Sequence, residues 1–257
     1  ELAPTFSEYA AALETVGCQT ERWTLQKENG FMLDERFCAF LASGGWDVVF
    51  LCNPNNPTGQ LIDPPLLEQI VQICHRKGIR LFVDECFLDF TDVWQEQSMK
   101  RWLSTHPEIL ILKAFTKSYG MAALRLGYCL SGDERLLAAM SRMVQPWNVS
   151  APAQAAGIAA LGETDFLERT RQIVRQQRSW LQKNLSSLGL TVYPSCANYL
   201  LLYSPYPLWG ELMKRKIVVR NCENYPGLGA GWFRAAVKQP QENQRLVAAL
   251  QEILEAL

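Results

Sequence analysis

The chain has 257 residues, of which 48% are hydrophobic and 20% charged, and its formal net charge is −1 at pH 7. This composition is typical of a globular chain that can bury one sizeable core and form a smaller second domain. No apolar run approaches the roughly 20 residues that a membrane-spanning helix needs, and the balanced charge gives no indication of a nucleic-acid partner. We therefore expect neither a nucleic-acid nor a membrane partner.

The first predicted element is an amphipathic helix that begins at Pro4 and ends near Gly17. Short apolar runs and helical patterns then alternate along the chain. We expect strands at 22–25, 48–51, 79–83 and 109–112, and helices at 34–41, 63–76 and 95–105. This alternation predicts an α/β fold with a mainly parallel sheet and flanking helices.

The pattern changes after residue 130. We expect helices at 133–143, 152–161, 164–188 and 240–257, and strands at 190–193, 198–203, 217–220 and 232–237. The glycine-rich stretch 227–231 leads into a strand rather than a helix, which indicates a turn or lid and not a dinucleotide-binding loop. These elements predict a smaller C-terminal α+β domain.

Eight cysteines are scattered along the chain with no CxxC spacing. This distribution predicts reduced thiols in a cytoplasmic protein, rather than a disulfide framework or a zinc site. The only two histidines, His75 and His106, lie in polar, helix-like segments. We expect both at the surface, and we expect no metal centre.

Three of the predicted strands end in polar residues. The strand 48–51 runs into the segment 53–59, NPNNPTG; the strand 79–83 runs into Asp84; and the strand 109–112 is followed by Lys117 and Arg125. In open α/β sheets, ligands bind beyond the carboxyl ends of the strands, so these residues predict a site for a small anionic ligand. The alternatives are ordinary ones: solvated loop charges for Lys117 and Arg125, and a helix or turn cap for Asp84.

The segments NPNNPTG, VDECFLDF and TKSYGMAALRLGY occur in this order and resemble the class I/II aminotransferase superfamily, the fold-type-I pyridoxal-phosphate enzymes. The resemblance implies that Lys117 forms the Schiff base with pyridoxal 5′-phosphate and that Asp84 pairs with the pyridine nitrogen. It also implies that Asn56 bonds the phenolic oxygen and that Arg125 holds the cofactor phosphate, as a planar guanidinium suits. The alternative for Asn56 is a simple Asx-turn before Pro57.

Three more cofactor-binding residues follow from the same resemblance. Phe6 corresponds to the aromatic residue that stacks on the cofactor ring, and a place in the ordinary core is an alternative of nearly the same weight. Phe87 occupies a position where the family often has a tyrosine that bonds the phenolic oxygen. Ala114 replaces a hydroxyl residue that commonly touches the phosphate, and Thr116 is a nearby hydroxyl that could substitute for it.

Arg234 lies inside the apolar stretch WFRAAV, where a charge is costly unless it meets an anion. By resemblance it matches the arginine that binds the substrate α-carboxylate, and a structural salt bridge is the alternative. Asn198 and Arg220 are expected to help in recognising the substrate.

Two branches of the superfamily resemble this chain most: the threonine-phosphate decarboxylases of cobalamin biosynthesis and the histidinol-phosphate aminotransferases. Both act on phosphorylated amino compounds, and members of the superfamily form homodimers. The resemblance implies a large cofactor-binding domain at residues 1–162 and a small α+β domain at 163–257.

Members of the superfamily usually carry further residues before this point, including a glycine-containing loop whose N–H groups bind the cofactor phosphate. We therefore expect the large domain to be N-terminally incomplete. A third possibility follows, a non-catalytic fragment or scaffold that lacks the phosphate loop.

Overall fold

The computed structural model describes residues 1–256 and divides the chain into two compact units. The central unit comprises Leu33–Asn53 and Ile62–Arg169, and the terminal unit comprises Glu1–Met32, Pro54–Leu61 and the chain from Thr170 onward. These units group residues by their packing. The boundary expected at residue 163 separates the large domain of the family from its small domain, and it stays a prediction.

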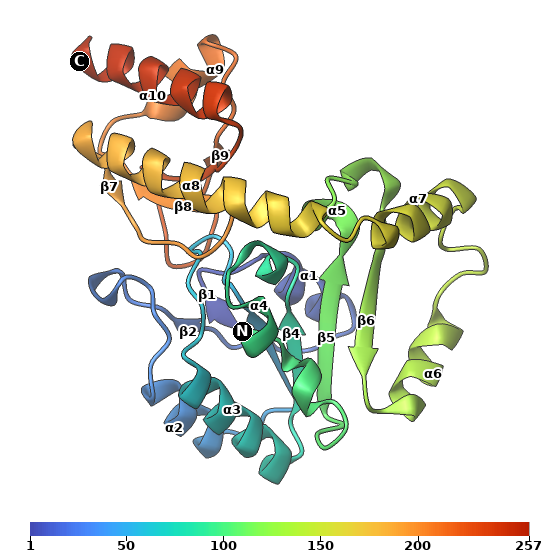
Figure 1. Cartoon of the computed structure of the whole chain (residues 1–257). Helices are drawn as coiled ribbons and strands as arrows, with labels where there is room; N and C mark the ends of the chain where they lie inside the picture. Colours follow the sequence, from blue (N-terminus) through green and yellow to red (C-terminus); the bar gives the residue numbers. More distant parts are fainter. Residues whose placement is uncertain (257) are drawn as a thin grey trace. The chain divides into compact units, whose positions relative to one another are not determined.

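The central unit is built on a four-stranded sheet with the strand order β3-β4-β5-β6 (Figure 1). Its elements in chain order are α2 (Arg36–Ser43), β3 (Val48–Cys52), α3 (Pro64–Lys77), β4 (Arg80–Asp84), α4 (Trp94–Gln97), β5 (Ile109–Ala114), α5 (Phe115–Ser118), β6 (Gly127–Ser131), α6 (Glu134–Met143) and α7 (Ala151–Gly162). Strands β3, β4 and β5 are parallel, as predicted, and β6 pairs antiparallel with β5. The strand β6, with the sequence GYCLS, was not predicted.

Local sequence explains why these elements form. The run ILILKA of β5 is buried at its first three positions, as expected of a strand that is covered on both faces. Helix α3 has prolines in its first turn and ends at Gly78, which adopts the left-handed conformation with φ of 68°. Its apolar side packs into the core of the unit, where Ile70 and Cys74 are fully buried.

The terminal unit contains a second four-stranded sheet, which is antiparallel and has the order β7-β8-β10-β9, and a short parallel pair, β1-β2 (Figure 1). Its elements are β1 (Leu2–Ala3), α1 (Glu8–Thr15), β2 (Trp23–Thr24), β7 (Thr191–Val192), β8 (Tyr199–Tyr203), α9 (Leu208–Lys214), β9 (Arg220–Asn221), β10 (Trp232–Ala236) and α10 (Pro240–Glu255). Helix α8 (Phe166–Ser187) begins in the central unit and continues into this one. Leucines of α8, β8 and α10 form the core of the unit, including Leu181, Leu200 and Leu250.

Some expectations require correction. The predicted helix 95–105 is divided into α4 and the 3-10 helix Met99–Trp102, because Ser98 adopts an extended conformation and its hydroxyl caps the second piece. Helix α9 was not predicted. The stretch 227–231 is a turn, as expected, and within residues 1–256 no helix combines the length and the apolar character needed to cross a membrane.

Candidate functional site

Lys117 lies in α5, the single helical turn that follows β5. Its side chain is exposed, and the ammonium nitrogen lies 6.0 Å from the centre of the Phe87 ring. Within residues 1–256 this amine forms no hydrogen bond or ion pair. The turn therefore presents a primary amine that is available for chemistry, next to an aromatic face.

Asp84 is the last residue of β4 and is half-buried. Its Oδ1 accepts a hydrogen bond from the backbone N–H of Cys86 at 2.9 Å, which is the turn cap considered as an alternative. The other carboxylate oxygen is not engaged in this cap. The cap therefore fixes the side chain and is compatible with a second, cationic partner.

A buried network beside these residues escaped the sequence analysis. Lys113 Nζ donates to Asp89 Oδ1 at 2.7 Å and lies 3.6 Å from Glu85 Oε2. Asp89 Oδ2 also accepts from the hydroxyl of Ser118 at 2.9 Å, and Glu85 accepts from the Met99 backbone N–H at 2.7 Å. The network joins the segment after β4 to the turn that carries Lys117. A lysine within the apolar strand ILILKA was the signal that such partners exist.

Charge interactions in this network oppose the cost of burial. Burial alone would lower the pKa of Lys113, but the carboxylates of Asp89 and Glu85 outweigh it and raise that pKa. Burial raises the pKa of Glu85, and the opposing attraction of Lys113 does not cancel the effect. Lys113 therefore stays protonated and serves as the fixed cation of the network.

The other two residues predicted in the central unit are less constrained. Arg125 is exposed, adopts a left-handed backbone conformation with φ of 54°, and donates from its guanidinium to the Ala122 carbonyl at 3.2 Å. Thr116 is half-buried in α5. The guanidinium has further N–H donors beyond this local bond, so it can still bind an anion.

In the terminal unit, Arg234 of β10 donates a hydrogen bond to Oδ1 of the buried Asn56. Its guanidinium carbon also lies 4.9 Å from the centre of the Tyr199 ring. Tyr199 is itself anchored, because its hydroxyl donates to the Asn55 carbonyl at 2.9 Å. Among residues 1–256, Arg234 has no acidic partner, so the salt-bridge alternative is not observed.

Arg220 lies directly opposite Arg234 in the antiparallel pairing of β9 with β10. Like charges at opposite positions destabilise a sheet unless something offsets them. Arg220 is exposed, and its guanidinium lies 5.5 Å from the Tyr225 ring and donates to Asn224 Oδ1 at 3.3 Å. In the part of the chain that the structure describes, neither of these two guanidinium groups on neighbouring strands is paired with a carboxylate.

Asn198 and Phe6 also belong to the terminal unit. The Oδ1 atom of Asn198 is buried without a hydrogen-bond partner, an uncommon state for a buried polar atom. Phe6 is 37% exposed and makes an edge-to-face contact with Tyr9 at 5.5 Å. Phe6 is therefore not an ordinary core residue.

The expectation for the histidines was correct for one and wrong for the other. His75 is exposed, whereas His106 is buried. The ring of His106 packs edge-on against the Trp102 ring at 5.0 Å, and this contact removes it from solvent.

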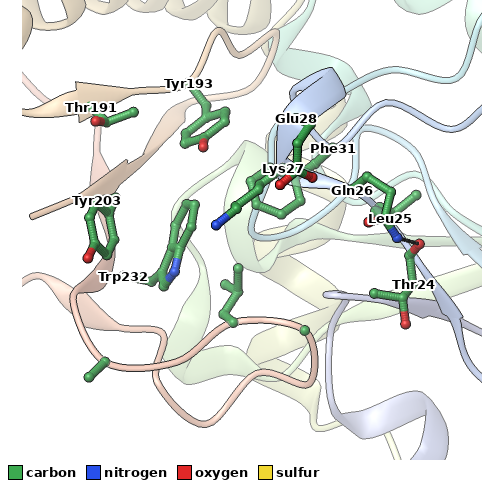
Figure 2. A pocket seen from close by; sticks show the side chains of 13 residues that line it. Thr24, Leu25, Gln26, Lys27, Glu28, Phe31, Thr191, Tyr193, Tyr203 and Trp232 are labelled. Carbon is green, nitrogen blue, oxygen red and sulfur yellow. Dashed lines mark hydrogen bonds between the residues drawn. The ribbon is translucent and has the colours of Figure 1, made fainter.

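A cavity of about 760 Å³ in the terminal unit is lined by none of the predicted site residues. Figure 2 shows Lys27, Tyr193 and Trp232 pointing toward one another in it. The rings of Tyr193 and Trp232 lie 5.4 Å apart, and the turn that begins at Gly227 lines the same cavity. The predicted site residues and this cavity are therefore separate features.

The model of the family described as aminotransferase class I and II matches residues 2–250. The chain is 38% identical over 257 residues to threonine-phosphate decarboxylase of Salmonella typhimurium, covering 98% of this chain and 70% of that protein. It is 31% identical over 252 residues to histidinol-phosphate aminotransferase of Methanosarcina mazei, covering 96% of this chain and 65% of that protein.

A solved structure agrees with these sequence relatives. The histidinol-phosphate aminotransferase from Clostridium acetobutylicum superimposes with a TM-score of 0.93 at 25% identity, covering 100% of this chain and 77% of that one. The chain thus spans about two thirds to three quarters of the length of these relatives. On sequence and fold alike, it belongs to the aminotransferase class I and II family.

Proposed function

We propose that this chain catalyses the pyridoxal-phosphate-dependent decarboxylation of L-threonine O-3-phosphate to (R)-1-aminopropan-2-yl phosphate, a reaction of cobalamin biosynthesis. Enzymes of this family depend on pyridoxal 5′-phosphate. The 38% identity to a threonine-phosphate decarboxylase supports the choice of reaction. The observation that carries the proposal is the pair of opposed arginines in β9 and β10.

Threonine phosphate carries two anionic groups, a carboxylate and a phosphate. Arg234 and Arg220 are opposed in the β10–β9 register and have no carboxylate partner among residues 1–256. Guanidinium groups bind both kinds of anion through parallel hydrogen bonds. We assign the α-carboxylate to Arg234, which is held by Asn56 and Tyr199, and the substrate phosphate to the more exposed Arg220. Asn198, whose buried amide oxygen has no hydrogen-bond partner among the described residues, would also contact the substrate.

The residues present fit the cofactor. Lys117 offers an amine that has no hydrogen-bond or ion-pair partner among residues 1–256, and the turn cap holds the carboxylate of Asp84 at the carboxyl end of β4. We assign Lys117 to the covalent bond with the cofactor aldehyde, Asp84 to the pyridine nitrogen and Arg125 to the phosphate. Asn56 would hold the phenolic oxygen.

Three further residues complete the proposed cofactor contacts. Phe6 would stack on the cofactor ring, and its exposed ring is consistent with that role. Phe87 would pack beside the amine of Lys117, and it supplies no phenol to bond the cofactor oxygen. Thr116 would contribute its hydroxyl to the phosphate where Ala114 cannot.

When bound, the cofactor serves as an electron sink for the pair released at the substrate α-carbon. The protein decides which bond at that carbon breaks by fixing the orientation of the carboxylate. In this chain Arg234 performs that task, because its own position is fixed by Asn56 and by the Tyr199 ring. Loss of carbon dioxide leaves the α-carbon in need of a proton. The amine of Lys117 is the group that we expect to hold and deliver it.

The alternative is a histidinol-phosphate aminotransferase or a related class I/II aminotransferase, which the 31% identity to the Methanosarcina mazei protein supports. Both reactions use a phosphorylated amino compound, so the arginine pair serves either one. The two differ in whether carbon dioxide leaves or an amino group passes to a keto acid. A non-catalytic fragment or scaffold is the third possibility.

Two assays on the chain supplied with pyridoxal phosphate separate these possibilities. We expect carbon dioxide release from threonine O-phosphate without any keto acid, and a loss of activity in Lys117→Ala. Amino transfer between histidinol phosphate and 2-oxoglutarate, with no carbon dioxide release, would select the aminotransferase. Neither activity, whether or not the chain retains the cofactor, would favour the scaffold. Light scattering on the same sample tests the homodimer that we propose for the protein.

A further inference from the structure

Two histidines and a glutamate meet in the central unit, near the amino end of β5. His75 lies in the last turn of α3, while His106 and Glu108 lie just before β5. One nitrogen from each histidine and one carboxylate oxygen of Glu108 lie within 4.8 Å of one another. We propose that these three residues bind a divalent first-row transition metal ion of the Zn²⁺ type. Imidazole and carboxylate donors suit such ions.

The hydrogen bonds of His106 leave one ring nitrogen ready to bind a metal. Thr105 Oγ1 donates its proton to the Trp102 carbonyl at 3.3 Å. The same oxygen lies 2.8 Å from His106 Nδ1, and with its proton directed to that carbonyl it can accept a hydrogen bond from Nδ1–H. We assign the ring proton to Nδ1, so that Nε2 presents its lone pair, and the Gln72 amide nitrogen 3.5 Å from Nε2 is consistent with this tautomer. A metal-bound histidine is held in this way, with its second nitrogen donating to a neighbouring oxygen.

The other two ligands are already in contact with each other. His75 Nδ1 lies 3.1 Å from Glu108 Oε1, and the two histidine rings are 5.0 Å apart. Ligands on a tetrahedral zinc ion lie about 3.4 Å apart, so the cluster must contract slightly. The His75 side chain is 50% exposed and can rotate to close it, whereas the buried His106 provides the fixed ligand. Water can occupy the fourth position from the exposed side.

Neighbouring groups accommodate a cation. The Trp102 ring packs edge-on against His106 and fixes its orientation. The Gln72 amide lies 3.5 Å from His106 Nε2. Arg80 donates to the Pro107 carbonyl at 2.9 Å, and its charge is paired with Asp133 at 3.0 Å. Without metal, the cluster is a hydrogen-bonded imidazole and carboxylate with a second imidazole beside them.

A metal bound here would join α3 to the segment before β5. Lys117 follows the opposite, carboxyl end of the same strand. The ion would therefore stabilise the central unit without touching the residues assigned to the cofactor. Its effect should appear in metal affinity and thermal stability, and not as a requirement for the chemical step.

The test is a titration of the metal-free, full-length chain with Zn²⁺, followed by calorimetry and by thermal unfolding. We expect one equivalent to bind and to raise the unfolding temperature. His75→Ala and Glu108→Gln, chosen because they leave the buried His106 in place, should each weaken binding at least tenfold. Thr105→Val, which removes the acceptor for His106 Nδ1, should weaken it roughly 10- to 100-fold.

Cysteine is the main competing ligand, because all eight cysteines are free and Cys18 is exposed. Cys18→Ser is therefore the matched control and should leave affinity and stoichiometry unchanged. Co²⁺ as a second probe should give no sulfur-to-metal charge-transfer band. The proposal is overturned if the wild-type chain binds no stoichiometric Zn²⁺, or if His75→Ala and Glu108→Gln both bind it as tightly as the wild type.

Discussion

Replacing Lys113 with methionine tests the buried charge network directly. The substitution keeps the length and apolar character of the side chain but removes its charge. The Lys113 side chain is 5% exposed, and those of Glu85 and Asp89 are 0% and 18% exposed. Both carboxylates would lose their cation in a site that water barely reaches. Removing one partner of a buried ion pair costs about 3–5 kcal/mol, so we expect a loss of that size in the free energy of unfolding near neutral pH.

The loss should depend on pH, with a definite sign. Burial already raises the pKa of Glu85, and removal of Lys113 should raise it further. A carboxyl with a raised pKa in the folded state binds protons more tightly there. This carboxyl therefore contributes most to the free energy of unfolding below its unfolded pKa of about 4.3. The contribution is lost as the pH rises through its pKa in the folded state. Lys113→Met should thus cost less at about pH 5 than at about pH 8.

The assay is urea unfolding of the variant and the wild type at both pH values. Lys238→Met provides the matched control, because Lys238 pairs with Glu242 at 2.8 Å but both side chains are at least half exposed. The control should cost less than about 1 kcal/mol. A loss in Lys113→Met as small as that of the control, or one that does not change with pH, would show that the network does not stabilise the fold as inferred.

Three further outcomes are expected. Lys117→Ala should fold normally but release pyridoxal phosphate on desalting, and a variant that retains it would contradict the assignment of this amine. Arg234→Lys should lower kcat/KM for threonine O-phosphate by about 10- to 100-fold, the equivalent of one lost charged hydrogen bond; unchanged kinetics would remove Arg234 from the substrate site. Gly231→Ala should cost at least about 1 kcal/mol in urea unfolding, because Gly231 has φ of 87° and a Cβ there would lie 2.4 Å from the Ser204 carbonyl oxygen. Gly229→Ala, with nothing near its Cβ position, should cost less, and equal losses would refute the steric reasoning.

The sequence by itself determined the type and order of most elements. The aliphatic run that predicted a strand at 109–112 forms β5, and the prolines and Gly78 bound α3 as their positions indicated. The segment around Lys117 was recognisable for the same reason, because its motif is contiguous. Periodicity, capping and motifs all depend on side chains within a few residues of one another, so a linear reading can detect them.

Only the tertiary structure decided which polar side chains meet. A charge at Lys113 was visible in the sequence, but its pairing with Asp89 depends on the packing of β5 against the segment after β4. The burial of His106 depends in the same way on how its loop folds against its neighbours. Arg234 and Asn56 are 178 positions apart, and the opposition of Arg234 to Arg220 follows from strand register. Register and long-range packing arise from the burial of the whole core, so no local pattern contains them.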